Sequence, residues 1–178
     1  MAESWVALLR GVNLGSRNRV PMAELRVILE EAGYGDVATY IQSGNVLFTR
    51  RASDRAALAR KLEHTIEDAF GVSAAVVLRT AAEIRKVARS HPFGTDTSKT
   101  HVAFLAKKPP AASVRSLKSE DPAQDQVQVT GSDVFLHYPD GVQGARLTGA
   151  LLERQLGMPA TIRNWRTVTR LAELSDSS

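Results

Sequence analysis

Apolar and polar positions along the first half of the chain predict the order strand, helix, strand, strand, helix, strand. The expected strands are short apolar and β-branched runs at Trp5–Arg10, Val37–Ile41, Val46–Thr49 and Ala74–Arg79. The expected helices begin at Pro21, as the first helical residue, and after Ser53, as the N-cap. Their apolar stripes are Met22, Leu25, Leu29 and Ala32 in one helix and Leu58, Leu62, Ile66 and Ala69 in the other. Gly33 and Gly71 end them.

The same order of elements returns in the second half. Thr80-Ala81-Ala82-Glu83 has the pattern of a capping box, which predicts a short helix there. Pro92 and a polar run over 94–100 follow it. Further strands are expected at His101–Ala106, Gln126–Thr130, Asp133–Tyr138 and Ala160–Arg163. Further helices are expected near Ser113–Leu117, over Leu147, Leu151 and Leu156, and after Asn164 as N-cap.

Two successive βαββαβ units predict an α+β protein, a tandem pair of ferredoxin-like subdomains packed into one unit. We expect a first subdomain over 1–79, a helical connector over 80–99 and a less regular second subdomain over 100–174. The runs Trp5–Leu9 and Val102–Ala106 are apolar at every position, which is typical of strands that are buried on both faces. We therefore expect the subdomains to cover each other's sheets or to share one sheet.

Composition removes several kinds of chemistry. The chain of 178 residues has no cysteine, which excludes disulfides, thiolate catalysis, iron–sulfur ligation and cysteine-type zinc sites. Its four histidines show no metal-ligand spacing, and no nucleophile elbow or zinc-protease motif occurs. We expect no metal, no cofactor and no catalysis, although an enzyme of an unidentified reaction stays open. Because no signal peptide or span of about 20 apolar residues is present, we expect a cytoplasmic protein.

The loop Gly11–Val20 is the first candidate for ligand binding. It precedes a helix, and backbone N–H groups at a helix start, together with arginines, can hold phosphate or carboxylate. In a βαββαβ unit the first two strands end at the same edge, so the hairpin at Gln42–Asn45 should lie beside this loop. The candidate residues for a small anionic ligand are Arg10, Asn13, Arg17, Arg19, Gln42, Ser43 and Asn45. The alternative is a loop that only needs glycine, followed by an ordinary hairpin whose Gly44-Asn45 pair makes a tight turn.

The segment Arg163-Asn164-Trp165 is a secondary candidate, because it combines stacking and hydrogen-bonding groups. The alternative is that Asn164 caps a helix and Trp165 anchors a core. The net charge is +4, and arginines gather near the C-terminus at Arg146, Arg154, Arg163, Arg166 and Arg170. Sequence-independent nucleic-acid binding therefore stays a second hypothesis, although the RNP1 pattern of RNA-binding ferredoxin-like sheets is absent. We expect no membrane partner.

Four blocks carry a family resemblance: 9–15 (LRGVNLG), 21–25 (PMAEL), 39–46 (TYIQSGNV) and 161–168 (TIRNWRTV). Together they resemble the bacterial domain-of-unknown-function family numbered 1697, over nearly the whole chain. The resemblance implies an uncharacterised structural-genomics family with a ferredoxin-like α+β architecture. It implies no catalytic or binding residues, and ligand identity, pathway and oligomeric state do not follow from it.

Overall fold

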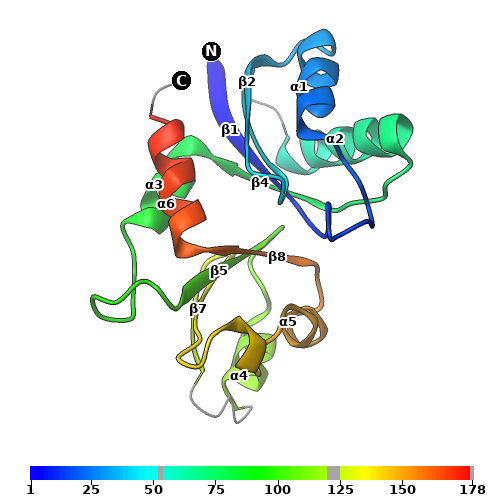
Figure 1. Ribbon diagram of the computed structural model, residues 1–178. Helices are drawn as coiled ribbons and strands as arrows, with labels where there is room; N and C mark the ends of the chain where they lie inside the picture. Colours follow the sequence, from blue (N-terminus) through cyan, green and yellow to red (C-terminus); the bar gives the residue numbers. More distant parts are fainter. Residues whose placement is uncertain (52–53, 120–124, 177–178) are drawn as a thin grey trace. The chain divides into compact units, whose positions relative to one another are not determined.

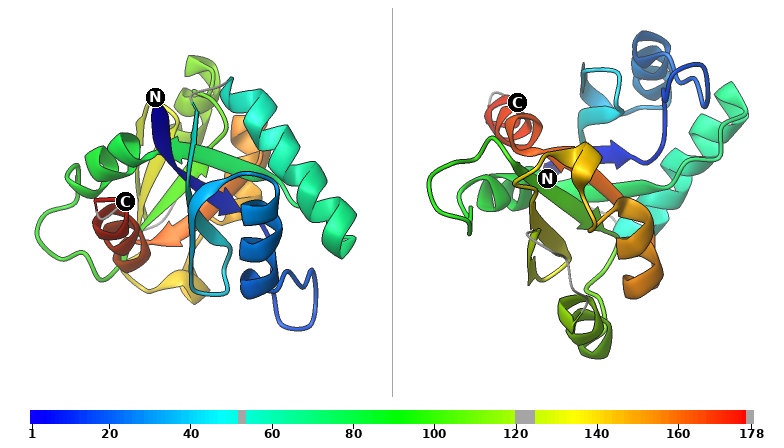
Figure 2. Two further views of the ribbon diagram at one scale, coloured as in Figure 1. Left: turned by 90° about the horizontal axis from the view of Figure 1, so that it is seen from above. Right: turned by 60° about the horizontal axis from the view of Figure 1, so that its bottom comes forward.

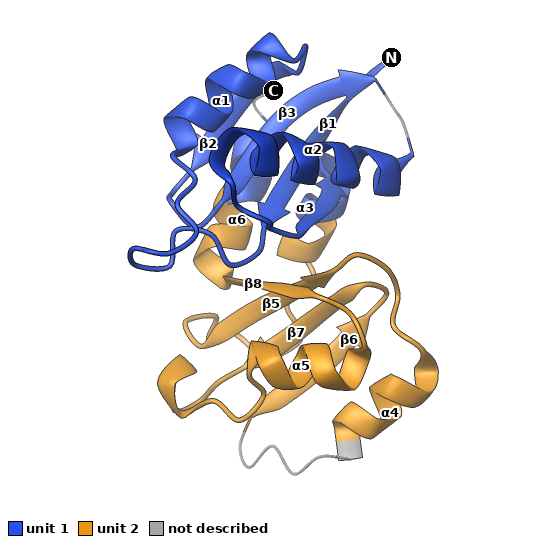
Figure 3. Cartoon of the chain, turned by 90° about the vertical axis from the view of Figure 1, so that its right-hand side faces the viewer, with its two compact units in different colours: residues 1–85, 171–178 blue, residues 86–170 orange. Residues whose placement is uncertain are grey.

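The computed structural model describes residues 1–51, 54–119 and 125–176 (Figure 1). These residues form an α+β fold with two four-stranded antiparallel sheets and six α-helices. The chain divides into two compact units, unit 1 with residues 1–85 and 171–178 and unit 2 with residues 86–170 (Figure 3). The boundaries that the sequence predicts, at 79, 99 and 174, stay a prediction.

Unit 1 contains the first sheet, with strand order β2-β3-β1-β4. Because β3 is antiparallel to both β1 and β2, these two strands run in the same direction. Helices α1 and α2 lie on one side of the sheet (Figure 2), where their leucines join a single core. The elements are β1 (Ala2–Leu9), α1 (Met22–Glu31), β2 (Gly35–Tyr40), β3 (Asn45–Arg51), α2 (Arg55–Phe70), β4 (Val76–Thr80) and α3 (Ala81–Ala88), whose last three residues belong to unit 2.

Unit 2 repeats this order of elements and of strands, with the sheet β6-β7-β5-β8. Leu117 of α4 and Leu152 and Leu156 of α5 pack on one side of this sheet. The last helix, α6, ends in residues that belong to unit 1. The elements are β5 (Thr100–Leu105), α4 (Ala111–Ser119), β6 (Gln126–Thr130), β7 (Asp133–His137), a 3₁₀ turn at Val142–Gly144, α5 (Gly149–Leu156), β8 (Ala160–Asn164) and α6 (Trp165–Leu174).

The two central strands are buried on both faces, as their uniform apolar sequence predicts. Successive residues of a strand point to opposite faces. In β1, Val6 and Leu8 on one face and Ala7 and Leu9 on the other are all buried. In β5, Val102 and Phe104 on one face and Ala103 and Leu105 on the other are buried as well. The expectation of one shared sheet is wrong, because the strands form two separate four-stranded sheets.

Helix ends account for several of the predicted boundaries. The capping box at α3 is confirmed: Glu83 N–H donates to Thr80 Oγ1 (3.2 Å), and Thr80 N–H donates to Glu83 Oε2 (2.8 Å). Asn164 caps α6, since its Oδ1 accepts from Thr167 N–H at 2.8 Å. Gly71 adopts the left-handed conformation at the end of α2.

Other predicted ends are wrong by one or a few residues. Pro21 is extended, with ψ 117°, and so precedes α1 instead of opening it. Ser53 lies outside the described residues, and the N-cap of α2 is Asp54, which accepts from Ala57 N–H. Leu147 lies before α5, whose N-cap is Thr148. Ala32 and Ala69 are exposed and do not join the core.

The hairpin between β2 and β3 also differs from the prediction. Strand β2 ends at Tyr40, and the positive φ angles fall at Ile41 (51°) and Gly44 (88°). Asn45 is instead the first residue of β3 and is fully buried. Positive φ is unusual for a β-branched residue such as Ile41, and the sequence carries no signal for it.

Candidate functional site

The structure brings together the two segments that the sequence predicts to lie side by side in unit 1. Asn13 holds its own loop, because its Oδ1 accepts from Val20 N–H (2.8 Å) and its Nδ2 donates to Val20 O (2.9 Å). The same Nδ2 donates to Gln42 O in the hairpin, at 2.7 Å. Leu9 N–H donates to Gly44 O at 2.8 Å. We call this region, residues 10–20 with 41–45, the loop site.

Asparagine side chains of the loop site donate hydrogen bonds to groups within the site or directly beside it. Asn18 Nδ2 donates to Gly11 O (2.9 Å). Asn45 Nδ2 donates to Tyr40 O (2.9 Å) and to Ser43 Oγ (3.1 Å) from a fully buried position. Asn13 and Asn45, two predicted ligand residues, therefore shape the loop and its turn. The remaining predicted side chains are exposed: Arg10, Arg17, Arg19, Gln42 and Ser43.

The N-terminus of α1, which follows the loop site, is a weak site for an anion. Pro21 has no N–H group, and it makes no side-chain cap. Glu24 lies in the first turn of α1 and places its own negative charge at that end of the helix. The negative charge of Glu24 therefore opposes an anion at this helix start, and an anion at the loop site would depend on the exposed arginines.

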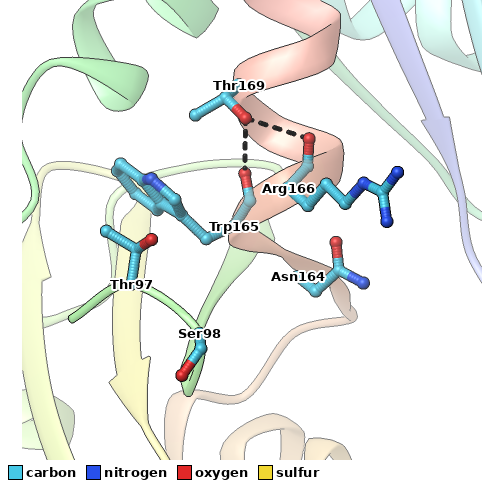
Figure 4. A pocket seen from close by; sticks show the side chains of 6 residues that line it. All are labelled: Thr97, Ser98, Asn164, Trp165, Arg166 and Thr169. Carbon is cyan, nitrogen blue, oxygen red and sulfur yellow. Dashed lines mark hydrogen bonds between the residues drawn. The ribbon is translucent and has the colours of Figure 1, made fainter.

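A pocket of about 530 Å³ lies in unit 2 (Figure 4), and we call it the α6 pocket. Two of its lining residues come from the segment before β5, one ends β8, and three belong to α6. Figure 4 shows Asn164 and Arg166 next to each other, whereas the Trp165 indole extends toward Thr97. The lining residues are Thr97, Ser98, Asn164, Trp165, Arg166 and Thr169.

The first turn of α6 forms one wall of this pocket. Asn164 satisfies Thr167 N–H, and Thr169 Oγ1 donates to the backbone oxygens of Trp165 (3.2 Å) and Arg166 (3.0 Å). Arg166 is exposed at the second helical position. The positive end of the helix dipole and the guanidinium therefore act on the same space.

The Trp165 side chain, which lines the pocket, packs against other aromatic rings. Trp165 is 8% exposed, and the rings of His91 and Phe135 lie 4.9 Å and 6.4 Å from it. His91 is itself held, since Nδ1 lies 3.0 Å from Gly94 O and Nε2 lies 2.7 Å from Thr100 Oγ1. Trp165 is thus a core anchor and a pocket wall at once.

No acid is among the six lining residues of the α6 pocket, although Asp96 lies next to it in the chain. Asp96 Oδ1 accepts from Ser98 N–H at 2.9 Å. Hydrogen bonds from the side chain and backbone of Ser98 lower the pKa of the fully exposed Asp96 carboxyl. The hydroxyl groups of Thr97 and Ser98 also line the pocket, and Arg166 is the only charged residue among the six.

Of the secondary candidates, Asn164 and Trp165 line the pocket and Arg163 does not. Arg163 is buried, and its Nη1 donates to Thr161 Oγ1 (2.8 Å) and Ile162 O (3.0 Å). Burial lowers the pKa of Arg163 to about 10. Sequence reasoning missed Thr97, Ser98 and Thr169, which it treated as parts of a connector and a helix. Arg166 was visible only as one of several C-terminal arginines.

Within the described ranges, no group of three or more histidine and acidic side chains is arranged to hold a metal ion. No helix in these ranges has the length and apolar character needed to cross a membrane.

Comparisons with known proteins give the family and a relative of known structure. Among curated proteins, no match was found. A solved structure, described as that of a conserved bacterial protein from Streptococcus pneumoniae, is similar to this chain with a TM-score of 0.78 and 23% identity. The similarity covers 98% of this chain and 99% of that one. The model of a family described as a protein of unknown function, DUF1697, matches residues 2–135, and the chain therefore belongs to the DUF1697 family.

Proposed function

We propose that this protein is a non-catalytic binding module for a small anionic ligand, such as a nucleotide or a phosphorylated metabolite. The α6 pocket is the site. One observation carries the proposal: the start of α6 and Arg166 face a hollow of about 530 Å³ whose lining contains no acid. A pocket of this size suits a small organic molecule.

The chemistry of the lining selects for phosphate or carboxylate. Helix starts attract anions through their N–H groups and dipole, and a charge-assisted hydrogen bond from arginine adds to this. Thr97, Ser98 and Asn164 supply neutral hydrogen-bonding groups, and Trp165 supplies an aromatic surface. A planar base or ring joined to a phosphate matches both parts of this lining.

The loop site remains a second location for the same class of ligand. Its arginines Arg17 and Arg19 are exposed, and so are Gln42 and Ser43 of the hairpin. Glu24 at the start of α1 opposes an anion there, which is why we place the ligand in the α6 pocket first. Sequence-independent nucleic-acid binding through Arg166 and Arg170 is the second candidate function, and both side chains are exposed on α6.

We also infer that each sheet with its helices is a ferredoxin-like subdomain, so that the chain is a tandem pair. The identical strand orders β2-β3-β1-β4 and β6-β7-β5-β8, each built from a βαββαβ series, support this inference. We also propose that the protein is bacterial and that it acts in the cytoplasm.

The proposal is tested by a thermal-shift and calorimetry panel of inorganic phosphate, ribose 5-phosphate, nucleoside mono- and triphosphates and short RNA, at two salt concentrations. A ligand at about 100 times its dissociation constant should stabilise the protein by about 2.7 kcal/mol. We expect Arg166→Ala to weaken binding about tenfold or more, because a hydrogen bond to a charged group is lost. The matched control is the double variant Arg17→Ala/Arg19→Ala, which should bind like the wild type.

A second variant separates the effect of charge on binding from an effect on stability. Asn164→Asp keeps an equally good N-cap and adds a negative charge to the pocket, so the melting temperature should hold while anion binding falls about tenfold. Binding that survives Arg166→Ala and is lost in the loop double variant would move the ligand to the loop site. Binding only of RNA, with a steep loss at higher salt, would favour the nucleic-acid function instead. No binding by any probe would overturn the proposal.

A further inference from the structure

Strand β6 is the last strand on its side of the unit 2 sheet, and it pairs only with β7 within the described residues. The side chains of Gln126, Gln128 and Thr130 are exposed, whereas Val127 and Val129 are half-buried against the core of unit 2. A strand in this position presents one row of backbone N–H and C=O groups to whatever lies beyond the sheet.

The corresponding edge strand of unit 1, β2, is protected against pairing with another chain. Its register with β3 shifts between Gly35 and Ala38, and Asp36 has a positive φ of 47°. The Asp36 carboxylate accepts from Thr49 Oγ1 at 2.9 Å. An irregular register and a charged residue are two of the devices by which edge strands avoid association.

Strand β6 has none of these devices. It runs in unbroken register with β7, from Gln126 opposite His137 to Thr130 opposite Asp133. Its sequence, Gln-Val-Gln-Val-Thr, contains no charge, proline or glycine, and it alternates β-branched with polar residues. This is the composition of a strand that can accept a further strand.

The hairpin geometry shows which backbone groups point outward. Gly131 and Ser132 form the two-residue turn, so Thr130 and Asp133 are the hydrogen-bonded pair that closes it. Hydrogen-bonded and non-hydrogen-bonded pairs alternate along an antiparallel ladder. The N–H and C=O groups of Val127 and Val129 therefore point away from β7, toward the free edge.

The β6 sequence is also complementary to itself about Gln128. In an antiparallel pair related by a twofold axis at Gln128, Val127 lies opposite Val129 of the second copy, and Gln126 lies opposite its Thr130. The outward backbone groups of both valines then meet in hydrogen-bonded pairs, because the register about Gln128 places them opposite each other. No position brings two like charges together.

We propose that β6 is a homodimerisation strand, which pairs antiparallel with β6 of a second copy of this chain. The two sheets of unit 2 then continue through a symmetric, isologous interface. Four backbone hydrogen bonds and two cross-strand valine pairs hold it, and these valines extend the core that they already border. Because the strand is only five residues long, the dimer is weak, with a dissociation constant between about 10 µM and 1 mM.

Sedimentation velocity over a range of concentrations tests the proposal directly on the full chain. We expect the wild type to pass from monomer to dimer between about 10 µM and 1 mM. Gln128→Lys places two ammonium groups opposite each other at the twofold axis and should weaken the dimer about tenfold or more. The control is Ala38→Lys, at an exposed position of β2, which should leave the dissociation constant unchanged.

The register is tested by a pair of double variants at exposed positions. Gln126→Lys/Thr130→Glu creates opposite charges across the axis and should dimerise at least as well as the wild type, whereas Gln126→Lys/Thr130→Lys should stay monomeric. A wild-type chain that stays monomeric at about 1 mM would overturn the proposal. So would a dimer that forms equally well in both double variants, because it would use another surface.

Discussion

The two units have the same order of elements, but the helices that follow their last strands, α3 and α6, are capped differently at their N-termini. In unit 1, α3 begins with the Thr80–Glu83 capping box, and Arg55 Nη2 donates to both oxygens of Glu83 (2.8 and 2.9 Å). In unit 2, Asn164 is the N-cap of α6, and the position that corresponds to Glu83 is Thr167. A carboxylate, that of Glu83, thus lies at the start of α3 in unit 1, whereas the equivalent position of α6 in unit 2 carries none.

The units also differ at other equivalent positions. Strand β1 carries Trp5 opposite Thr80, whereas β5 carries His101 opposite Asn164. Edge strand β2 has an irregular register and carries Asp36, whereas β6 pairs in unbroken register and has no charged residue. One architecture can therefore pair the polar groups at its helix starts and sheet edges within the unit, or leave them exposed.

The hairpin turns offer the largest expected effect within this comparison. A Cβ atom at Gly44 would lie 2.7 Å from both Leu9 Cβ and Val12 Cγ2, and the residue has φ +88°. Gly44→Ala should therefore lower the free energy of unfolding by about 3 to 5 kcal/mol, through a strained backbone and an overpacked core. Urea unfolding followed by the fluorescence of Trp5 and Trp165 measures this.

Gly131 in the β6–β7 turn is the matched control. It has φ +62°, but a Cβ atom there would meet nothing within 4 Å. Gly131→Ala should cost only the left-handed backbone, about 1 to 2 kcal/mol. Equal losses for the two variants would show that the packing around Gly44 is not what distinguishes the hairpins.

Local chemistry explains how much of this fold the sequence predicts. A capping box needs two residues at fixed spacing, and the Thr80–Glu83 pair states it fully. The contact between the Gly11–Val20 loop and the Gln42–Asn45 hairpin also follows from strand order alone, and the hydrogen bond from Asn13 to Gln42 confirms it. In contrast, Ile41 adopts a positive φ against the preference of a β-branched residue, and no residue type near it in the sequence indicates this.

The α6 pocket shows where sequence reasoning stops. Its two walls come from Thr97–Ser98 and from Asn164–Thr169, which are distant in the chain. Each wall alone has an ordinary explanation, a polar connector and a capped helix. Only the pairing of β5 with β8 brings them together, since it places His101 opposite Asn164.

A medium effect is expected at the start of α3. Burial raises the pKa of the Glu83 carboxyl, but the Arg55 hydrogen bonds, the Thr80 N–H and the charges of Arg55 and Arg79 together lower it below the ordinary value of 4.5. A carboxyl with a lowered pKa stabilises the fold above the unfolded-state value and loses that contribution as the pH falls below it. Glu83→Ala should cost about 1 kcal/mol at pH 7 and less at pH 3.

The corresponding change in unit 2 sharpens the contrast, because an amide cap does not titrate. Asn164→Ala should cost about 1 kcal/mol equally at pH 7 and pH 3. Glu83→Gln retains a residue that completes a capping box, so it isolates the charge. Urea unfolding at both pH values measures all three variants, and a cost of Glu83→Ala that does not change with pH would refute the role of its charge.

The smallest expected effect concerns His101, the unit 2 counterpart of Trp5. Burial lowers the pKa of His101 below the ordinary value of 6.5, although a hydrogen bond with the Lys99 backbone opposes this. Its Nδ1 is buried without a partner among the described residues, and the Tyr138 ring lies 5.2 Å away. The unfolded chain therefore binds a proton more readily than the folded one, and stability falls as the pH drops below about 6.5.

The stability difference between pH 7 and pH 5.5 isolates this contribution better than the stability at either pH. We expect His101→Gln to reduce that difference by less than about 1 kcal/mol. His64→Gln, at an exposed position of α2, is the control variant. If the two variants reduce the difference equally, the pH dependence of stability does not come from the burial of His101. The presence of histidine in β5, where β1 has Trp5, would then have no effect on how stability depends on pH.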